Sequence, residues 1–245
     1  MKKFIPAFIA LILLLGCDSS SDSGIGGTSP LGAEAYFPLQ IGNWWKYNGW
    51  EIDAQGDTIP GTAYTMFTEV IDDSTISGET YYLLQDSSNA SGLWETEIAQ
   101  LARISGDSVI FLMSFFEDTS QHQRAIMAIL PAQINYEWTV LSMDTTSASP
   151  GGDTVNISLT WTGEILDFDS LNTPAGAFSD CYQLGYTMDF EVSTPDTAIA
   201  FFMESKSWTA PHVGLAKMTQ YPWEGPDGPE PGDYQELVEY SVASP

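Results

Sequence analysis

The sequence predicts an all-β protein, whose antiparallel and strongly curved sheet forms a partly closed barrel or a sandwich. Apolar and polar residues alternate from Asn156 to Ile165 and again from Gln183 to Val192. Alternation with a period of two is typical of strands that have one buried and one solvated face. Turn-forming residues separate many further short apolar runs, and no segment has the periodicity of an amphipathic helix.

Weaker strand candidates precede and follow these two segments. One of them, from Ser108 to Phe116, is apolar at almost every position. A strand of this kind is covered on both faces, so we expect it to pack under another layer or to line an apolar cavity. The candidates, in chain order, are 44–53, 63–72, 80–85, 97–104, 108–116, 123–130, 136–142, 197–208, 213–220 and 234–242.

The composition excludes several classes of protein. The chain of 245 residues has 7 Lys+Arg against 33 Asp+Glu, a formal net charge of −26. So few cations cannot neutralise phosphates, which argues against nucleic acid as a partner. The 8 Trp, 11 Tyr and 12 Phe are too many for a disordered chain. Acids such as Glu164, Asp189 and Glu191 occupy the polar positions of the alternating strands, which indicates a solvated face.

The first residues have the features of an export signal. Lys2 and Lys3 precede an apolar run from Phe4 to Leu15, which is too short to span a bilayer as a helix. The run ends in Leu14-Leu15-Gly16-Cys17, which resembles the bacterial lipobox. The resemblance implies that a diacylglycerol is attached to Cys17, that cleavage occurs before it, and that 1–16 is a signal peptide. The alternative is an ordinary signal peptide with a chance Cys.

Further short motifs resemble those of uncharacterised bacterial envelope lipoproteins. They are Phe37-Pro38-Leu39 with Gly42, Trp45 and Tyr47, the turn Pro174-Ala175-Gly176-Ala177-Phe178, and Trp208-x-Ala210-Pro211-x-Val213-Gly214-Leu215. In those lipoproteins the last motif has Gly where this chain has His212. The resemblance implies a location in the cell envelope, and it supplies no catalytic residue.

The mature chain would consist of a tether and a head. Residues 17–35, rich in Ser, Gly and Asp, are expected to form a lipidated, flexible tether of roughly 25 Å. Residues 36–245 are expected to form one β-rich domain. Only five cations remain after removal of 1–16, so 5 against 33 acids gives a charge of −28. Once Cys17 is lipidated, Cys181 has no partner for a disulfide, and we expect it to be a buried structural thiol.

An internal repeat divides the head. Phe37-Pro38-Leu39-Gln40-Ile41 is followed by Trp45, and Leu130-Pro131-Ala132-Gln133-Ile134 is followed by Trp138. Each motif reads apolar-Pro-x-Gln-Ile-x-x-x-Trp, and each Trp is expected to enter a strand as a core residue. The alternatives are a duplicated β-unit with halves 37–129 and 130–242, or chance similarity between β-rich segments.

The sequence contains no motif that assigns catalysis. His122 and His212 have no second His or Cys at ligand spacing, so a zinc site is not expected. Calcium is the only cofactor we consider. Its candidate loops are Asp72-Asp73, Asp167-x-Asp169-x-x-Asn172 and Asp227-x-x-Glu230-x-x-Asp233, none of which follows the EF-hand pattern.

The leading hypothesis is therefore a non-enzymatic envelope lipoprotein with a β-domain for binding or scaffolding. Its partners would be the membrane, through the lipid anchor, and an envelope protein or ligand that the sequence does not identify. One alternative is a carrier with an apolar or lipid ligand in a half-barrel cavity. Another is a secreted glycan hydrolase with paired carboxylates. The head would stand on the periplasmic or the extracellular face of the envelope.

Overall fold

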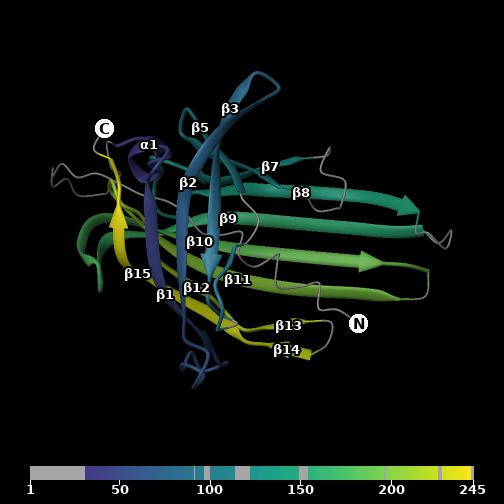
Figure 1. Ribbon diagram of the computed structural model, residues 1–245. Helices are drawn as coiled ribbons and strands as arrows, with labels where there is room; N and C mark the ends of the chain where they lie inside the picture. The colour runs from purple at the N-terminus through teal and green to yellow at the C-terminus, as the bar shows by residue number, and fades with distance from the viewer. Residues whose placement is uncertain are drawn as a thin grey trace.

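One antiparallel sheet curls into a nearly closed barrel (Figure 1). The computed structural model describes residues 31–90, 92–96, 100–113, 122–148, 154–195, 197–225 and 228–243. The expected all-β class and partly closed barrel are confirmed. The strands of the main sheet are β1 (Trp44–Ile52), β2 (Tyr64–Ile76), β3 (Glu79–Ser88), β4 (Glu95–Thr96), β5 (Gln100–Ser105), β6 (Ser108–Met113), β7 (Gln123–Ile129), β8 (Glu137–Ala148), β9 (Thr154–Thr173), β10 (Gly176–Ser193), β11 (Ala198–Ala210), β12 (Gly214–Gln220) and β15 (Gly232–Ser241).

The sheet consists of two meanders joined edge to edge. The first runs β1-β2-β3-β5-β6-β7 and the second β8-β9-β10-β11-β12-β15, while β4 pairs with β3 only. β1 pairs with β15, which joins the meanders. β13 (Trp223–Gly225) and β14 (Gly228–Glu230) form a separate two-stranded sheet. The order places β7 and β8 at the two ends of the main sheet, so they face each other across the seam of the barrel.

Side chains close part of this seam. The Trp138 indole Nε1 donates a hydrogen bond to the Ile126 carbonyl oxygen at 2.7 Å. The Tyr186 hydroxyl donates to the Met127 carbonyl oxygen at 2.9 Å. These bonds satisfy two carbonyl groups at the edge of β7, which a neighbouring strand would otherwise satisfy.

A short helix, α1 (Ala33–Tyr36), packs at one end of the barrel (Figure 1). Its Tyr36 hydroxyl donates to the Asp180 carbonyl oxygen at 2.9 Å, and the Tyr36 carbonyl oxygen accepts from the Thr209 hydroxyl at 3.3 Å. Ala33 and Ala35 are buried. Residues 33–35, the last of the predicted tether of residues 17–35, thus belong to this packed helix. Among the described residues, no helix is long and apolar enough to cross a bilayer.

Large aromatic side chains fill the barrel near α1. Tyr36, Phe37, Trp45, Tyr47 and Tyr182 are all fully buried in one hydrophobic cluster. Trp138 belongs to the same cluster, so the prediction that both repeated Trp residues are core residues is confirmed. This end of the barrel is packed by side chains, as expected for the interior of a folded domain.

The interior of the barrel also contains polar side chains. Tyr64, Asp233 and Gln235 form one hydrogen-bonded group: the Tyr64 hydroxyl lies 2.7 Å from Asp233 Oδ2, and Gln235 Nε2 lies 2.8 Å from the same oxygen. Asp86 is also buried, and it accepts a hydrogen bond from the Thr68 hydroxyl. Hydrogen bonds of this kind offset the cost of removing carboxyl groups from water.

The two repeated motifs form equivalent turns. Gly42 and Asn135, at matching positions, both have a left-handed backbone, with φ of 90° and 65°. The Gly42 amide donates to the Val70 carbonyl oxygen at 2.8 Å, and the Asn135 amide donates to the Ile165 carbonyl oxygen at 2.7 Å. Val70 lies in β2 and Ile165 in β9, the second strand of each meander. Each turn thus fixes the first strand of a meander against the second strand.

The structure also tests the predictions for the alternating segments, for β6 and for Cys181. The alternating segments lie within β9 and β10. In β6, Val109, Ile110, Phe111 and Met113 are buried, so both faces of this strand are covered; residues 114–116 lie outside the described residues. Cys181 is buried as expected, and this burial raises the pKa of its thiol to about 12.

Candidate functional site

The outward face of β8 to β11 presents side chains in two parallel rows. The pairing registers place Glu137 opposite Glu164, Glu164 opposite Gly185, and Gly185 opposite Lys206. The second row is Thr139, Thr162, Thr187 and Glu204, which are neighbours by the same registers. Tyr221 continues this row, because its amide donates to the Glu204 carbonyl oxygen at 3.0 Å.

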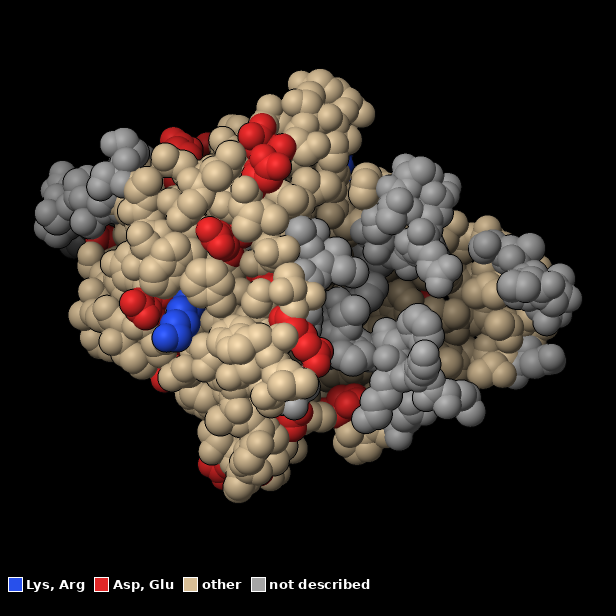
Figure 2. Space-filling model, in the orientation of Figure 1, with Lys and Arg blue, Asp and Glu red and all other residues tan. Residues whose placement is uncertain are grey.

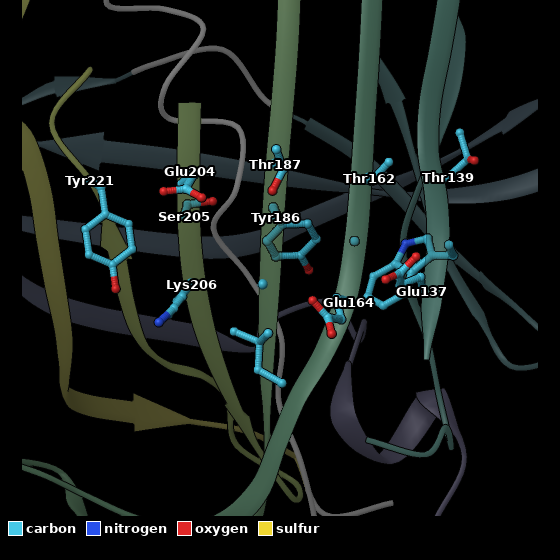
Figure 3. A pocket seen from close by; sticks show the side chains of 14 residues that line it. Glu137, Thr139, Thr162, Glu164, Tyr186, Thr187, Glu204, Ser205, Lys206 and Tyr221 are labelled. Carbon is cyan, nitrogen blue, oxygen red and sulfur yellow. The ribbon is translucent and has the colours of Figure 1, made fainter. Parts of the chain in front are cut away.

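These rows line a groove with a volume of about 720 Å³. Figure 3 shows Glu137 and Glu164 on one side of it and Glu204, Lys206 and Tyr221 on the other. Gly185 lies between the two sides, and the Leu166 side chain covers the place where a Cβ at Gly185 would lie. The groove therefore has an apolar patch in its floor and polar groups around it.

Irregularities of two strands lie beside the groove. The extra residue of a β-bulge is Val140 in β8 and Leu166 in β9, and a third bulge at Ala216 in β12 lies further away. A β-bulge bends its strand and increases the local twist. The bulges in β8 and β9 lie beside the groove, and Leu166 itself lines it.

The chemistry of the groove is that of hydrogen bonding. Three threonine hydroxyls can donate and accept, three carboxylates accept, and the Lys206 ammonium donates. The Lys206 Nζ lies 5.6 Å from the centroid of the Tyr221 ring, which holds it at one wall. Glu137 and Glu164 are directly opposite each other on neighbouring strands, an arrangement that costs free energy because like charges repel.

Aromatic side chains extend the first row beyond the groove. Lys206 pairs with Thr219, Thr219 with Tyr234, and Tyr234 with Trp50. The Tyr234 and Trp50 rings are stacked with centroids 4.7 Å apart. The Lys217 Nζ lies 4.7 Å from the Trp208 ring centroid and 5.1 Å from that of Tyr234. We call Trp50, Trp208 and Tyr234, together with Lys217, the aromatic strip.

Two smaller hollows lie elsewhere. One of about 340 Å³ is on the outer face of β9 to β11, beside Asp189, Glu191 and Phe202. Another of about 560 Å³ opens beside α1 and is lined by Phe37, Tyr82 and Arg103 among others. His212 borders the second hollow, and burial lowers its pKa to about 4. An imidazole of this kind is neutral at pH 7.

The residues singled out from sequence have different places in the structure. Cys17 and Asp227 lie outside the described residues. Asp72, Asp73, Asp167 and Asp169 are exposed. Within the described ranges, no three acidic, His or Cys side chains are placed to hold a metal ion. His212 has a left-handed φ of 59°, a conformation that favours Gly, which is the residue expected here from the resemblance.

The alternation of the sequence predicts a solvated face for Thr162, Glu164 and Thr187, and all three line the groove. Glu137, Lys206 and Tyr221 were missed, because their proximity depends on the pairing register of distant strands. The alternation Thr160, Thr162, Glu164 is visible in the sequence, but it does not specify which residues lie opposite.

Acidic groups are spread over the rest of the surface. Figure 2 shows Asp and Glu scattered over the visible face, with Lys and Arg rare. In the described part of the chain Lys46 pairs with Glu239 at 3.6 Å, and Arg103 and Arg124 both contact Glu79. Lys206 and Lys217 lie instead against aromatic rings, in and beside the groove.

The fold is similar to that of a crystal structure from Parabacteroides distasonis, described as a "putative lipoprotein". The sequences are 17% identical, the alignment covers 84% of this chain and 97% of that one, and the TM-score is 0.52. A "putative exported protein" with a YmcC-like fold from Bacteroides fragilis aligns over 82% of this chain and 96% of its own, with 17% identity and a TM-score of 0.42.

At such identities the similarity concerns the fold. The sequence matches no protein-family model and no curated protein.

Proposed function

We propose that this chain is a bacterial envelope lipoprotein, anchored through lipidated Cys17, whose barrel binds a ligand non-enzymatically in the groove over β8 to β11. The groove is the observation that carries the proposal: it is about 720 Å³ in volume, and hydrogen-bonding side chains from neighbouring strands line it. The export signal and lipobox motif support the anchor, and the similar fold of a protein described as a lipoprotein agrees with it.

The packing of the barrel favours an outer site over a carrier cavity. Tyr36, Trp45, Tyr47 and Tyr182 fill the interior near α1, so an apolar ligand would have to displace core side chains there. Displacing such residues costs several kcal/mol each. The groove needs no such rearrangement.

The anchor is tested by the intact mass of the protein purified from its native membrane. We expect a chain that begins at Cys17 and carries a diacylglyceryl group, with or without a further acyl chain. A membrane-derived chain that begins at another residue, or that carries no lipid, would refute the anchor.

Binding in the groove is tested by native mass spectrometry of the same preparation. We expect a non-covalent adduct on the wild type that disappears in the double variant Thr162→Ala/Glu164→Gln. Glu69→Gln is the matched control, because Glu69 is also a half-buried glutamate on a strand but lies outside the groove. An adduct that survives in the double variant, or no adduct on the wild type, contradicts the assignment of the groove.

A second candidate function, glycan hydrolysis, is favoured by one pair of residues. Glu137 and Glu164 are directly opposite, and such positions place Cβ atoms about 4.5–5.5 Å apart. Retaining glycosidases hold their two carboxyl groups about 5–5.5 Å apart, a separation that two glutamate side chains can adopt from such positions. If the protein is a hydrolase, Glu137→Gln and Glu164→Gln each abolish glycan cleavage; a ligand recovered intact after long incubation excludes this function.

A further inference from the structure

We infer that the ligand of the groove is an uncharged glycan chain that extends across the strands from the groove onto the aromatic strip. This inference rests on the proposed function and names the ligand class of the same site. Its basis is the composition of one continuous row of outward side chains, together with the direction in which that row runs.

The row crosses seven neighbouring strands, and only Gly185 contributes no side chain to it. It leads from Glu137 through Gly185 and Lys206 to Tyr234 and Trp50. Strands lie about 4.8 Å apart, so six spacings measure about 29 Å along the curved outer face of the barrel. A curved surface of this length fits an extended chain that bends round the barrel better than a compact small molecule.

The row is on the face of the sheet, where the backbone groups already pair with neighbouring strands. A peptide that binds by adding a strand needs a free sheet edge instead. Recognition on this face must therefore come from side chains. Sugars match the side chains present, because hydroxyl groups both donate to carboxylates and accept from threonine and lysine.

Aromatic rings provide the second kind of contact that a sugar needs. Trp50, Trp208 and Tyr234 are half-buried, so part of each ring reaches the surface. The cross-strand stacking of Trp50 on Tyr234 fixes the orientation of these rings before any ligand binds. Rings held rigidly lose little conformational entropy when a sugar ring packs on them.

The charges of the site argue against an anionic chain. Glu137, Glu164 and Glu204 outnumber Lys206 in the groove, and the mature chain carries a formal charge of −28. A polyuronate or a phosphorylated polymer would be repelled both by the groove and by the whole molecule.

The test compares oligosaccharides of different length and charge, with a peptide as a further probe. The probes are maltose, cellobiose and N,N′-diacetylchitobiose, the three corresponding hexasaccharides, hexagalacturonate, and a neutral unstructured peptide. They are titrated calorimetrically into the detergent-solubilised lipoprotein. We expect at least one neutral hexasaccharide to bind more tightly than its own disaccharide, and neither hexagalacturonate nor the peptide to bind.

Variants of the protein then show where the bound hexasaccharide lies. We expect Trp50→Ala to weaken the hexasaccharide about tenfold and to leave the disaccharide unchanged, because only the longer chain reaches the strip. The double variant Thr162→Ala/Glu164→Gln should weaken the binding of both the hexasaccharide and the disaccharide. Trp44→Ala is the matched control, since Trp44 is a half-buried tryptophan of the same strand that stacks on Phe67, outside the row.

Three results overturn the inference: no neutral hexasaccharide binds, the peptide or the polyuronate binds better, or Trp50→Ala and Trp44→Ala have equal effects. These three results can be told apart from a failure of the proposed function, which the native adduct tests separately. If the native adduct depends on the groove but no hexasaccharide binds, the groove remains the site and the glycan assignment is wrong.

Discussion

Asp233 shows how a single half-buried group makes stability depend on pH. Burial raises its pKa from 3.8 to about 6, and the negative charge of Glu51 adds to this effect, while hydrogen bonds from Tyr64 and Gln235 oppose it. The folded state therefore holds a proton that the unfolded state has already lost. Its stabilising contribution is complete below pH 3.8 and disappears as the pH rises through 6.

We expect Asp233→Asn to remove this dependence. Between pH 4.5 and 7.5 the free energy of unfolding of the wild type should fall by about 2 kcal/mol more than that of the variant, since one pKa unit corresponds to about 1.4 kcal/mol. Urea denaturation at the two pH values measures the difference. Asp189→Asn, at an exposed position, is the control. Parallel pH profiles for wild type and Asp233→Asn would contradict this role.

At the scale of elements, the two repeated turns behave as one motif. Gly42 and Asn135 share a left-handed backbone, and a Cβ at Gly42 would meet no other atom. The exchanges Gly42→Asn and Asn135→Gly should therefore change the free energy of unfolding by less than about 1 kcal/mol. Gly42→Val and Asn135→Val should each cost about 1–2 kcal/mol, because a β-branched residue is strained at positive φ.

Thermal or urea unfolding of the four variants checks this expectation. If Asn at position 42 is as damaging as Val, the two turns are not equivalent, and the duplicated β-unit loses its main structural support.

The seam between β7 and β8 should be the weakest part of the barrel. Trp138→Phe and Tyr186→Phe each leave a β7 carbonyl without its donor, which costs about 1–3 kcal/mol for a buried group. We expect amide hydrogen exchange in β7 to accelerate in both variants while exchange in β1 and β2 is unchanged. Uniform acceleration throughout the sheet would show that these bonds stabilise the whole fold and not the seam.

Strand positions could be read from the sequence because alternation is a local property. The pattern in 156–165 and 183–192 depends only on which side chains face the core. α1 escaped detection because four residues form a single turn and its burial depends on distant strands. The groove could not be predicted from the sequence for a related reason. It depends on the register between strands, and a shift by one residue would turn Glu164 and Lys206 to the other face of the sheet.

At the scale of the whole molecule, the acid excess describes a surface and not a site. The full sequence carries a formal charge of −26, and its acids are scattered over the visible face (Figure 2). Self-repulsion at low ionic strength should destabilise the compact state. We expect the melting temperature to rise with added NaCl, because the screening length shortens to about 8 Å at 0.15 M. A melting temperature insensitive to NaCl but raised by micromolar calcium would instead indicate a specific cation site.

The central claim is that the ligand lies on the outer face of the sheet. Hydroxyl-radical footprinting of the membrane-extracted protein tests it most directly, before and after the ligand is removed by reversible unfolding. We expect oxidation of Tyr221 and Trp208 to increase when the ligand is removed, and that of Trp45 and Tyr47, which are buried inside the barrel, to stay unchanged. An increase confined to Trp45 and Tyr47 would contradict the account and would point to a carrier.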